Sequence, residues 1–126
     1  MSVRTGIGWD SHRLVEGRRL ILGGVDLAHE RGLAGHSDAD VLTHAVIDAL
    51  LGAAGLGDIG EHFPDGDPRF EGADSLALLR DVVALLGPRE ILNVDTTVLS
   101  TCSMVKPCSA TVATTVRSRA IESAPA

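Results

Sequence analysis

The stretch of sequence that decides the fold is residues 36–55, which read HSDADVLTHAVIDALLGAAG. Its apolar side chains recur every three or four positions, the spacing that places them on one face of a helix. Ser37 and Asp38 have the short polar side chains that cap helices, so a helix is predicted from there to the glycine-rich region that begins at Gly52. We expect its core-facing stripe to contain Leu42, Ala45, Val46, Ala49, Leu50 and Ala53.

The segments around this helix predict strands, a hairpin and a second helix. Gly23 and Gly24 suit the positive φ angles of a two-residue hairpin turn. The second helix should begin at Asp74 or Ser75 and end at Gly87, which a proline follows. The expected elements are, in order, a strand over 3–12, a hairpin of 20–22 and 25–27, a loop to residue 36, the long helix, a helix over 74–86 and a strand over 91–99.

The composition limits the class of protein. The chain has 126 residues, a net charge of -6 and 44% hydrophobic residues, which suits one domain with a packed core. It contains neither an apolar run of the ~20 residues that a membrane span requires, nor a signal-peptide pattern, nor a basic patch with stacking aromatic residues. We therefore expect a soluble, cytoplasmic protein without membrane or nucleic-acid partners. Cys102 and Cys108 form neither a disulfide framework nor a paired metal-ligand spacing.

The composition changes after Asp95. Residues 1–95 contain all 14 glycines and all five histidines of the chain, whereas residues 96–126 are rich in Ser and Thr. Such a C-terminal segment is typical of a disordered tail, and an altered or incomplete end explains it equally well.

Two segments carry the residue types that bind metal ions. Asp10 and His12 alternate along the first strand and therefore share a face, about 7 Å apart along the backbone. His44 lies on the long helix, nearly opposite its stripe of core residues. One carboxylate and two imidazoles form a catalytic type of zinc set, which leaves a fourth position open. Two alternatives stay open here: a turn-forming Asp beside a solvated His, and a His on a solvated helix face.

Residues 57–68, GDIGEHFPDGDP, are too rich in Gly, Pro and Asp for regular structure and predict a shaped loop. Glycines let backbone amides approach a ligand closely, and Asp58 and Asp65 offer acceptors for hydroxyl groups or a cation. A plain turn connection explains the composition as well. The spacing of the acidic residues does not fit a calcium-binding loop.

Residues 3 to about 97 contain a series of specific motifs: GIGWDSH, LILGGV, the run over 32–60, HFPDGDP, GADSL and NVD. Their order and spacing resemble the 2-C-methyl-D-erythritol 2,4-cyclodiphosphate synthase family. The resemblance implies an α+β fold with a mixed β-sheet packed against helices on one side, in a protomer of a homotrimer with active sites between subunits. It divides the chain into a cyclodiphosphate synthase-like domain over 1–97, incomplete relative to the family, and an atypical, disordered or altered tail over 98–126.

The resemblance also implies a function. The family converts 4-diphosphocytidyl-2-C-methyl-D-erythritol 2-phosphate into the cyclic diphosphate and releases CMP, a lyase reaction of non-mevalonate isoprenoid biosynthesis. Asp10, His12 and His44 would bind Zn²⁺, while Mg²⁺ or Mn²⁺ would bridge the diphosphate as a second ion. His36 would be catalytic, by stabilising charge that develops at the phosphates. The implied substrate-binding residues are Asp10, Ser11, His12, His36, Ser37, Asp58, Ile59, Gly60, Phe63, Pro64 and Asp65.

After Asp95 the match to the family fades. The nucleotide-binding segment and the glycine-rich ending of the family have no counterpart, and Thr114 and Thr115 form one short match to a late motif. Two further functions therefore compete with the synthase. One is a truncated, catalytically impaired metal-binding trimer subunit, and the other is a zinc hydrolase of other phosphoesters, which would need an activated water.

Overall fold

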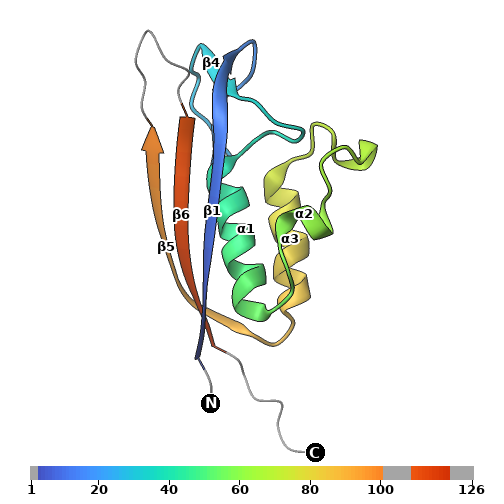
Figure 1. Cartoon of the computed structure of the whole chain (residues 1–126), viewed down its shortest axis with the longest axis vertical. Coiled ribbons are helices and arrows are strands. Elements are labelled where there is room, and N and C mark those ends of the chain that lie inside the picture. Colours follow the sequence, from blue (N-terminus) through green and yellow to red (C-terminus); the bar gives the residue numbers. More distant parts are fainter. Residues whose placement is uncertain (1–2, 101–108, 120–126) are drawn as a thin grey trace, which may run out of the picture.

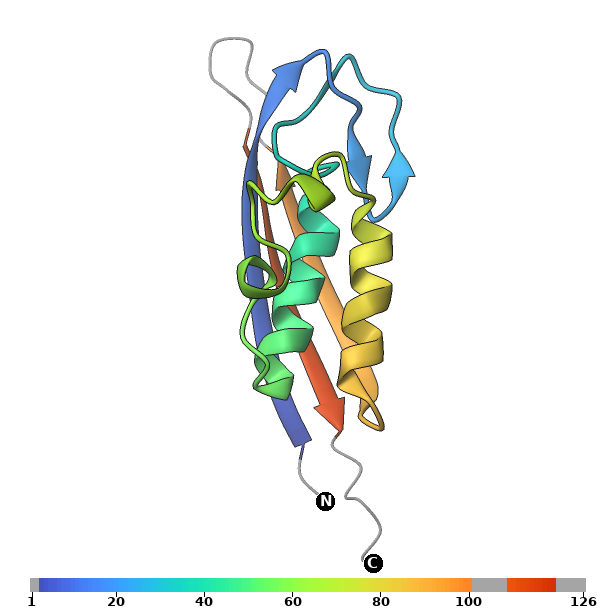
Figure 2. The same ribbon diagram turned by 90° about the vertical axis from the view of Figure 1, so that its right-hand side faces the viewer.

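The computed structural model describes residues 3–100 and 109–119, which form a layer of β-sheet covered on one face by helices (Figure 1, Figure 2). None of the described helices combines the length and the hydropathy that a membrane crossing requires. The elements are β1 (Val3–Glu16), β2 (Ile21–Leu22), β3 (Val25–Asp26), β4 (Arg31–Leu33), α1 (Val41–Ala54), α2 (Ile59–His62), η1 (Pro68–Phe70), α3 (Ser75–Leu86), β5 (Glu90–Ser100) and β6 (Ser109–Arg119).

The main sheet has the strand order β4–β1–β6–β5, and β2 pairs with β3 in a separate hairpin. All pairings in the main sheet are antiparallel; Thr115 of β6, for example, lies between Ile7 of β1 and Asp95 of β5. The expected mixed sheet is therefore wrong for the described strands. Only residues 101–108 connect β5 to β6, and parallel neighbours need a longer crossover than that.

The α+β class and the position of the helices on one side of the sheet are confirmed (Figure 2). The hairpin forms around Gly23 and Gly24, whose φ angles are 58° and 79°. α3 begins after its N-cap Asp74 and ends before Gly87, as predicted. The first strand continues beyond the predicted end because β4, which was expected to be loop, pairs with its last residues. A short helix, α2, also interrupts the predicted loop over 57–68.

β6 lies within the segment that the sequence marks as atypical. Its backbone forms the strand between β1 and β5. The sequence of β6, SATVATTVRSR, is rich in β-branched residues, which favour extended backbone. Residues 101–108 and 120–126, with both cysteines, lie outside the described residues. The domain division at residue 97 stays a prediction, although β5 runs through it.

Two glycines allow α1 to lie directly on β1. Gly6 and Gly8 are on the face of β1 that meets the helix. A Cβ atom at Gly8 would lie 1.7 Å from the carbonyl oxygen of Ala45, and one at Gly6 would lie 2.0 Å from the carbonyl oxygen of Ala49. Neither position has room for a side chain, so the backbones of strand and helix are in contact.

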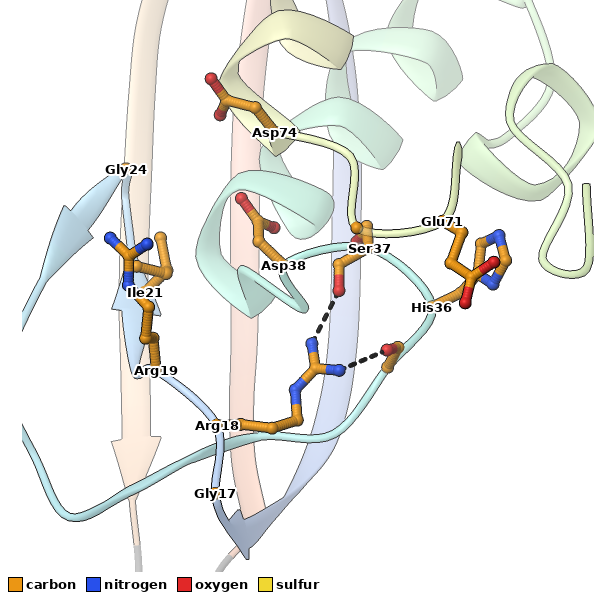
Figure 3. Close-up of a pocket in the computed structure, with 12 residues that line it drawn as sticks. Gly17, Arg18, Arg19, Ile21, Gly24, His36, Ser37, Asp38, Glu71 and Asp74 are labelled. Carbon is orange, nitrogen blue, oxygen red and sulfur yellow. Dashed lines mark hydrogen bonds between the residues drawn. The ribbon is translucent and has the colours of Figure 1, made fainter. Parts of the chain in front are cut away.

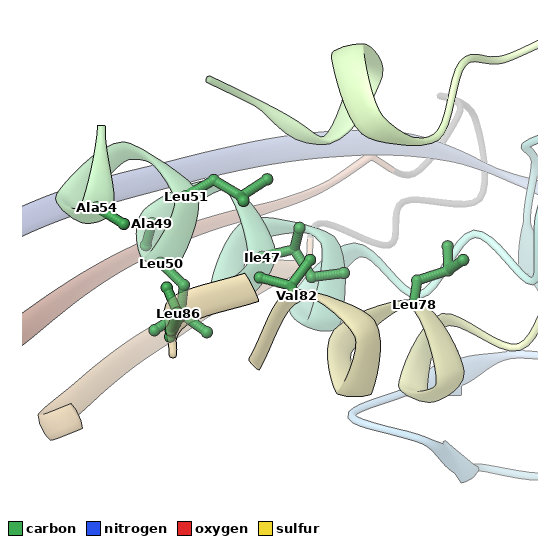
Figure 4. Packing of buried hydrophobic residues seen from close by; sticks show 8 residues of the cluster. All are labelled: Ile47, Ala49, Leu50, Leu51, Ala54, Leu78, Val82 and Leu86. Carbon is green, nitrogen blue, oxygen red and sulfur yellow. The ribbon is translucent and has the colours of Figure 1, made fainter. Parts of the chain in front are cut away.

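α1 is buried on two sides, because β1 covers one side and α3 packs against another (Figure 4). The cluster between the two helices contains Ile47, Ala49, Leu50, Leu51, Ala54, Leu78, Val82 and Leu86. Of the expected stripe, the alanines and Leu50 are buried, whereas Leu42 and Val46 are only half-buried. Val41, Ile47 and Leu51 were missed because a single stripe assumes a single covering layer.

Asp40, rather than Ser37 or Asp38, is the N-cap of α1. Its fully buried carboxylate accepts hydrogen bonds from the backbone N–H and the hydroxyl of Thr43, at 3.1 and 2.8 Å. It also accepts hydrogen bonds from the backbone N–H groups of Gly23 and Gly24, at 2.9 and 2.7 Å. One side chain therefore joins the start of the long helix to the hairpin turn.

Replacing Gly8 by Ala should destabilise the fold by about 1–3 kcal/mol, the usual cost of overpacking a filled core, because α1 must move away from β1. Gly52 of α1 is a matched control, since nothing lies within 4 Å of a Cβ atom there. Gly52→Ala should be neutral or stabilise the fold by up to about 1 kcal/mol. Urea unfolding measures both free energies, and equal stabilities would contradict the close contact.

Candidate metal centre

Three side chains from β1 and α1 converge at one point. Asp10 and His12 lie on the helix-facing side of β1, and His44 reaches them from the first turns of α1. Oδ2 of Asp10 is 2.9 Å from Nε2 of His12 and 3.2 Å from Nδ1 of His44. The three ligand atoms all lie within 4.8 Å of one another. The structure thus brings together the residues whose spacing suggested a metal site.

These residues fit a divalent metal ion. Two atoms that bind one tetrahedral ion at ~2.0 Å lie about 3.3 Å from each other, close to both separations from Asp10. A carboxylate and two imidazoles are also donors that zinc accepts, and three protein ligands leave one position open for a further ligand. Both geometry and donor chemistry therefore suit such an ion.

Both histidines are largely buried. The side chain of His44 is 12% exposed and that of His12 is 20% exposed. A solvated helix face and a solvated His beside a turn are therefore wrong as explanations of these residues. His44 lies on the side of α1 that faces β1. There the carboxylate of Asp10 accepts hydrogen bonds from both imidazoles.

The pKa values of Asp10 and His12 are shifted by their surroundings in this group. Burial alone would raise the pKa of Asp10, but the hydrogen bonds from His12 and His44 outweigh it and hold that pKa well below its usual range. The pKa of His12 is raised, chiefly by its hydrogen bond to Asp10 and against the opposing effect of burial. Asp10 is therefore in the ionised form that binds a cation.

A hydrogen bond at the far ring nitrogen orients His12. Its Nδ1 is 2.7 Å from the carbonyl oxygen of Ala34, which can only accept, so this nitrogen must donate. When the ring is neutral, the form that binds a metal ion, it keeps this proton and its lone pair is at Nε2, the atom that faces the metal position. Such partners of metal-binding histidines fix the tautomer and the ring orientation.

A cavity of about 330 Å³ opens beside the three ligands. Ser11 and Asp58 do not line it: Ser11 is exposed on the other face of β1, and exposed Asp58 caps α2 through the backbone N–H of Glu61 at 2.9 Å. Gly35, Phe70 and Leu78 line it without having been expected. The predicted substrate-binding residues in its wall are Asp10, His12, His36, Ser37, Ile59, Gly60, Phe63, Pro64 and Asp65.

Arg18 stabilises the loop that contains His36 and Ser37. Its guanidinium donates hydrogen bonds to the carbonyl oxygens of Gly35 at 3.0 Å and Ser37 at 2.7 Å (Figure 3). His36 is oriented in turn by donating from Nε2 to the carbonyl oxygen of Asp67 at 2.8 Å. Nothing in the sequence marks Arg18 for this role, because its partners are backbone atoms.

A larger hollow of about 840 Å³ lies against the same loop (Figure 3). It shares Gly35, His36 and Ser37 with the smaller cavity but contains none of the three candidate metal ligands. Arg18 and Arg19 line it together with acidic residues, so its walls carry both signs of charge. The metal centre therefore belongs to the smaller cavity.

The fold and this centre define an α+β protein with a candidate three-residue site for a divalent metal ion beside a cavity of ligand size. A sequence profile of the YgbB family matches residues 3–123. The chain belongs to the YgbB family.

Curated relatives carry the name 2-C-methyl-D-erythritol 2,4-cyclodiphosphate synthase. The protein from Geobacter metallireducens is 63% identical over 100 residues, which cover 78% of this chain and 64% of that protein. The protein from Dechloromonas aromatica is 61% identical over 102 residues, which cover 79% of this chain and 64% of the relative. This chain therefore spans just under two thirds of the length of these relatives.

Solved structures share the fold. The bifunctional IspDF from Campylobacter jejuni has a TM-score of 0.86 at 30% identity, covering 95% of this chain and 43% of that one. A 2C-methyl-D-erythritol-2,4-cyclodiphosphate synthase in a CDP-bound form has a TM-score of 0.79 at 32% identity, covering 90% of this chain and 98% of that one. IspF from Plasmodium falciparum, at 23% identity and a TM-score of 0.74, shares the fold, with 94% of this chain and 96% of that one covered.

His44→Ala should abolish the binding of one Zn²⁺ per chain, because it removes one of three ligands. His29 provides a matched control, since it is exposed and lies outside the group of ligands. Equilibrium dialysis followed by metal analysis measures the Zn²⁺ bound per chain in both variants and in the unmodified protein. Zn²⁺ binding that survives the loss of His44 would refute the ligand assignment.

Proposed function

We propose that this chain is a subunit of a 2-C-methyl-D-erythritol 2,4-cyclodiphosphate synthase, a lyase of isoprenoid biosynthesis. The observation that carries the proposal is the convergence of Asp10, His12 and His44 beside a cavity, in a chain whose relatives of that name are 61% and 63% identical. The proposed substrate is the small molecule 4-diphosphocytidyl-2-C-methyl-D-erythritol 2-phosphate. The CDP-bound relative supports a cytidine diphosphate ligand.

In the proposed reaction, an oxygen of the 2-phosphate forms a bond to the β-phosphorus of the same molecule. The bond from the β-phosphorus to the oxygen that bridges to the α-phosphorus breaks, and CMP leaves with that oxygen. Because two anions must meet, the reaction needs positioning and charge neutralisation more than covalent catalysis. Zn²⁺ held by Asp10, His12 and His44 would supply Lewis-acidic positive charge, and the proposed second ion, Mg²⁺ or Mn²⁺, would neutralise charge on the diphosphate.

His36 is the proposed catalytic residue. Its ring lines the cavity of the metal ligands, and the hydrogen bond to Asp67 fixes its orientation, so it would stabilise charge on the phosphates from a preset position. The proposed substrate contacts are Ser37 and the cavity residues of segments 59–60 and 63–65. Ser11 and Asp58, outside this lining, stay predictions. All of these residues fall within the proposed synthase-like domain over 1–97, with 98–126 as an atypical C-terminal segment.

We also propose that the subunits form a homotrimer. Ile7 and Trp9 lie on the face of β1 turned away from α1 and are 72% and 62% exposed. The pairing register puts Leu99, which is 61% exposed, on the same face of the sheet. None of the described helices covers this face (Figure 2). An apolar sheet surface of this kind favours burial against further copies of the chain.

The chain supplied with Zn²⁺, Mg²⁺ and the substrate should release CMP, which chromatography of the nucleotides measures. His36→Ala should lower kcat about 10²- to 10³-fold, the usual effect of losing one group that stabilises developing charge, without loss of Zn²⁺ binding. His29→Ala should leave turnover unchanged. Zn²⁺ binding without CMP release would favour the catalytically impaired subunit, and turnover of simple phosphate esters would favour the hydrolase.

Trp9→Glu should convert the trimer into monomers, because a charge would have to be buried in the apolar interface. Val25→Glu is a matched control, since Val25 is 57% exposed but lies in the β2–β3 hairpin away from this face. Light scattering coupled to size-exclusion chromatography gives the mass of each variant. A Trp9 variant with the mass of the unmodified chain would place the interface elsewhere.

A further inference from the structure

A series of hydrogen bonds leads from the candidate metal ligand His44 to a second carboxylate. Nε2 of His44, the nitrogen that faces away from the metal position, is 2.8 Å from Oγ of Ser75. The hydroxyl of Ser75 is in turn hydrogen-bonded to the carboxylate of Asp38. Ser75 is fully buried and is the first residue of α3. The series therefore links α1, α3 and the loop before α1.

The direction of each hydrogen bond follows from what the groups can donate. A carboxylate accepts but does not donate, so the one hydroxyl proton of Ser75 must point to Asp38. Oγ of Ser75 then offers His44 only lone pairs, and Nε2 of His44 must carry a proton. Only neutral imidazole binds a metal ion, and in that form the lone pair of the ring is consequently at Nδ1, the atom that lies 3.2 Å from Oδ2 of Asp10 in the candidate metal centre.

Asp38 is itself held in place for this role. Its carboxylate accepts hydrogen bonds from the backbone N–H groups of Ser75 and Asp40, both at 3.0 Å. Ser37 also approaches Nε2 of His44, but at 3.2 Å, and its hydroxyl oxygen already accepts a hydrogen bond from the backbone N–H of Ala39. Ser75 is therefore the closer partner of His44 and the one connected to a charge.

We infer that Ser75 and Asp38 are positioning residues for the divalent metal ion, because together they hold His44 in the tautomer and orientation that present Nδ1 to it. The inference rests on the proposed metal site and adds two residues that touch neither the ion nor the substrate. Outer partners of this kind typically change metal affinity 10- to 100-fold.

The test compares Ser75→Ala, Asp38→Asn and the double variant with the unmodified chain. Competition with a chromophoric chelator measures Zn²⁺ affinity, and the visible spectrum of the Co²⁺-loaded chain reports on the ligand geometry. Ser75→Ala should weaken Zn²⁺ binding about 10- to 100-fold and alter the Co²⁺ spectrum. Asp38→Asn should weaken binding in the unmodified chain but add little in the Ser75→Ala background, since its effect passes through Ser75.

Thr43→Val is the matched control, because Thr43 also has a buried hydroxyl that donates to an aspartate, Asp40, but does not contact a ligand. It should lower the stability of the metal-free chain and leave Zn²⁺ affinity unchanged. Thermal unfolding of the metal-free variants establishes that each is folded. If Ser75→Ala does not fold, the Zn²⁺ affinities of Asp38→Asn and Thr43→Val are compared instead. Weaker binding by Asp38→Asn alone supports the inference, and equal affinities contradict it.

Several outcomes would overturn the inference. Unchanged Zn²⁺ affinity in Ser75→Ala, or a full effect of Asp38→Asn in the Ser75→Ala background, would show that the two residues do not act on His44 as a pair. An unmodified chain that binds no Zn²⁺ would remove the metal site and this inference with it. Normal binding by the unmodified chain and by both variants would leave the metal site standing and reject the positioning role alone.

Discussion

The contact between the backbones of β1 and α1 is the constraint on which the rest of the structure depends. It exists because Gly6 and Gly8 have no side chains where the carbonyl oxygens of Ala45 and Ala49 meet the strand. Strand residues two apart share a face, so the next positions beyond Gly8 on this face carry the ligands of β1. His44 directly precedes Ala45 on the helix. The distance that the glycines allow is therefore also the distance across which the metal ligands meet.

Three carboxylates gather near the start of α1 in a chain of net charge -6, and one of them differs from the other two in its donors. Asp40 and Asp38 each accept from one hydroxyl and from backbone amides. Asp10 accepts from two imidazoles. Backbone amides keep their protons when a metal ion binds nearby. A protonated imidazole, in contrast, releases a proton on binding the ion, because only neutral imidazole is a metal ligand. Of the three, Asp10 is thus the carboxylate whose surroundings change when a cation arrives.

The sequence predicts those features that depend on neighbours along the chain. Alternation placed Asp10 and His12 on one face, and the cap at Asp74 with the glycine at 87 fixed both ends of α3. Features that depend on distant pairing were missed. Asp40 is held at the start of α1 by hydrogen bonds from the hairpin turn, 16 and 17 residues away. The position of β6 depends on its pairing with two strands at once. Helical periodicity also cannot reveal that a polar face is covered by a strand, which is why His44 could be taken for a solvated residue.

The loop over 34–38 has more influence on the centre than its lack of regular structure suggests. Its first residue orients His12 through a carbonyl oxygen, and its last reaches His44 through Ser75. The two ligand imidazoles, although they come from β1 and α1, are therefore oriented by one short segment. His36 belongs to the same segment, so a displacement of this loop would disturb the metal ligands and the cavity wall together. The two hydrogen bonds from Arg18 to its carbonyl oxygens oppose such a displacement and keep both parts of the site in a fixed relation.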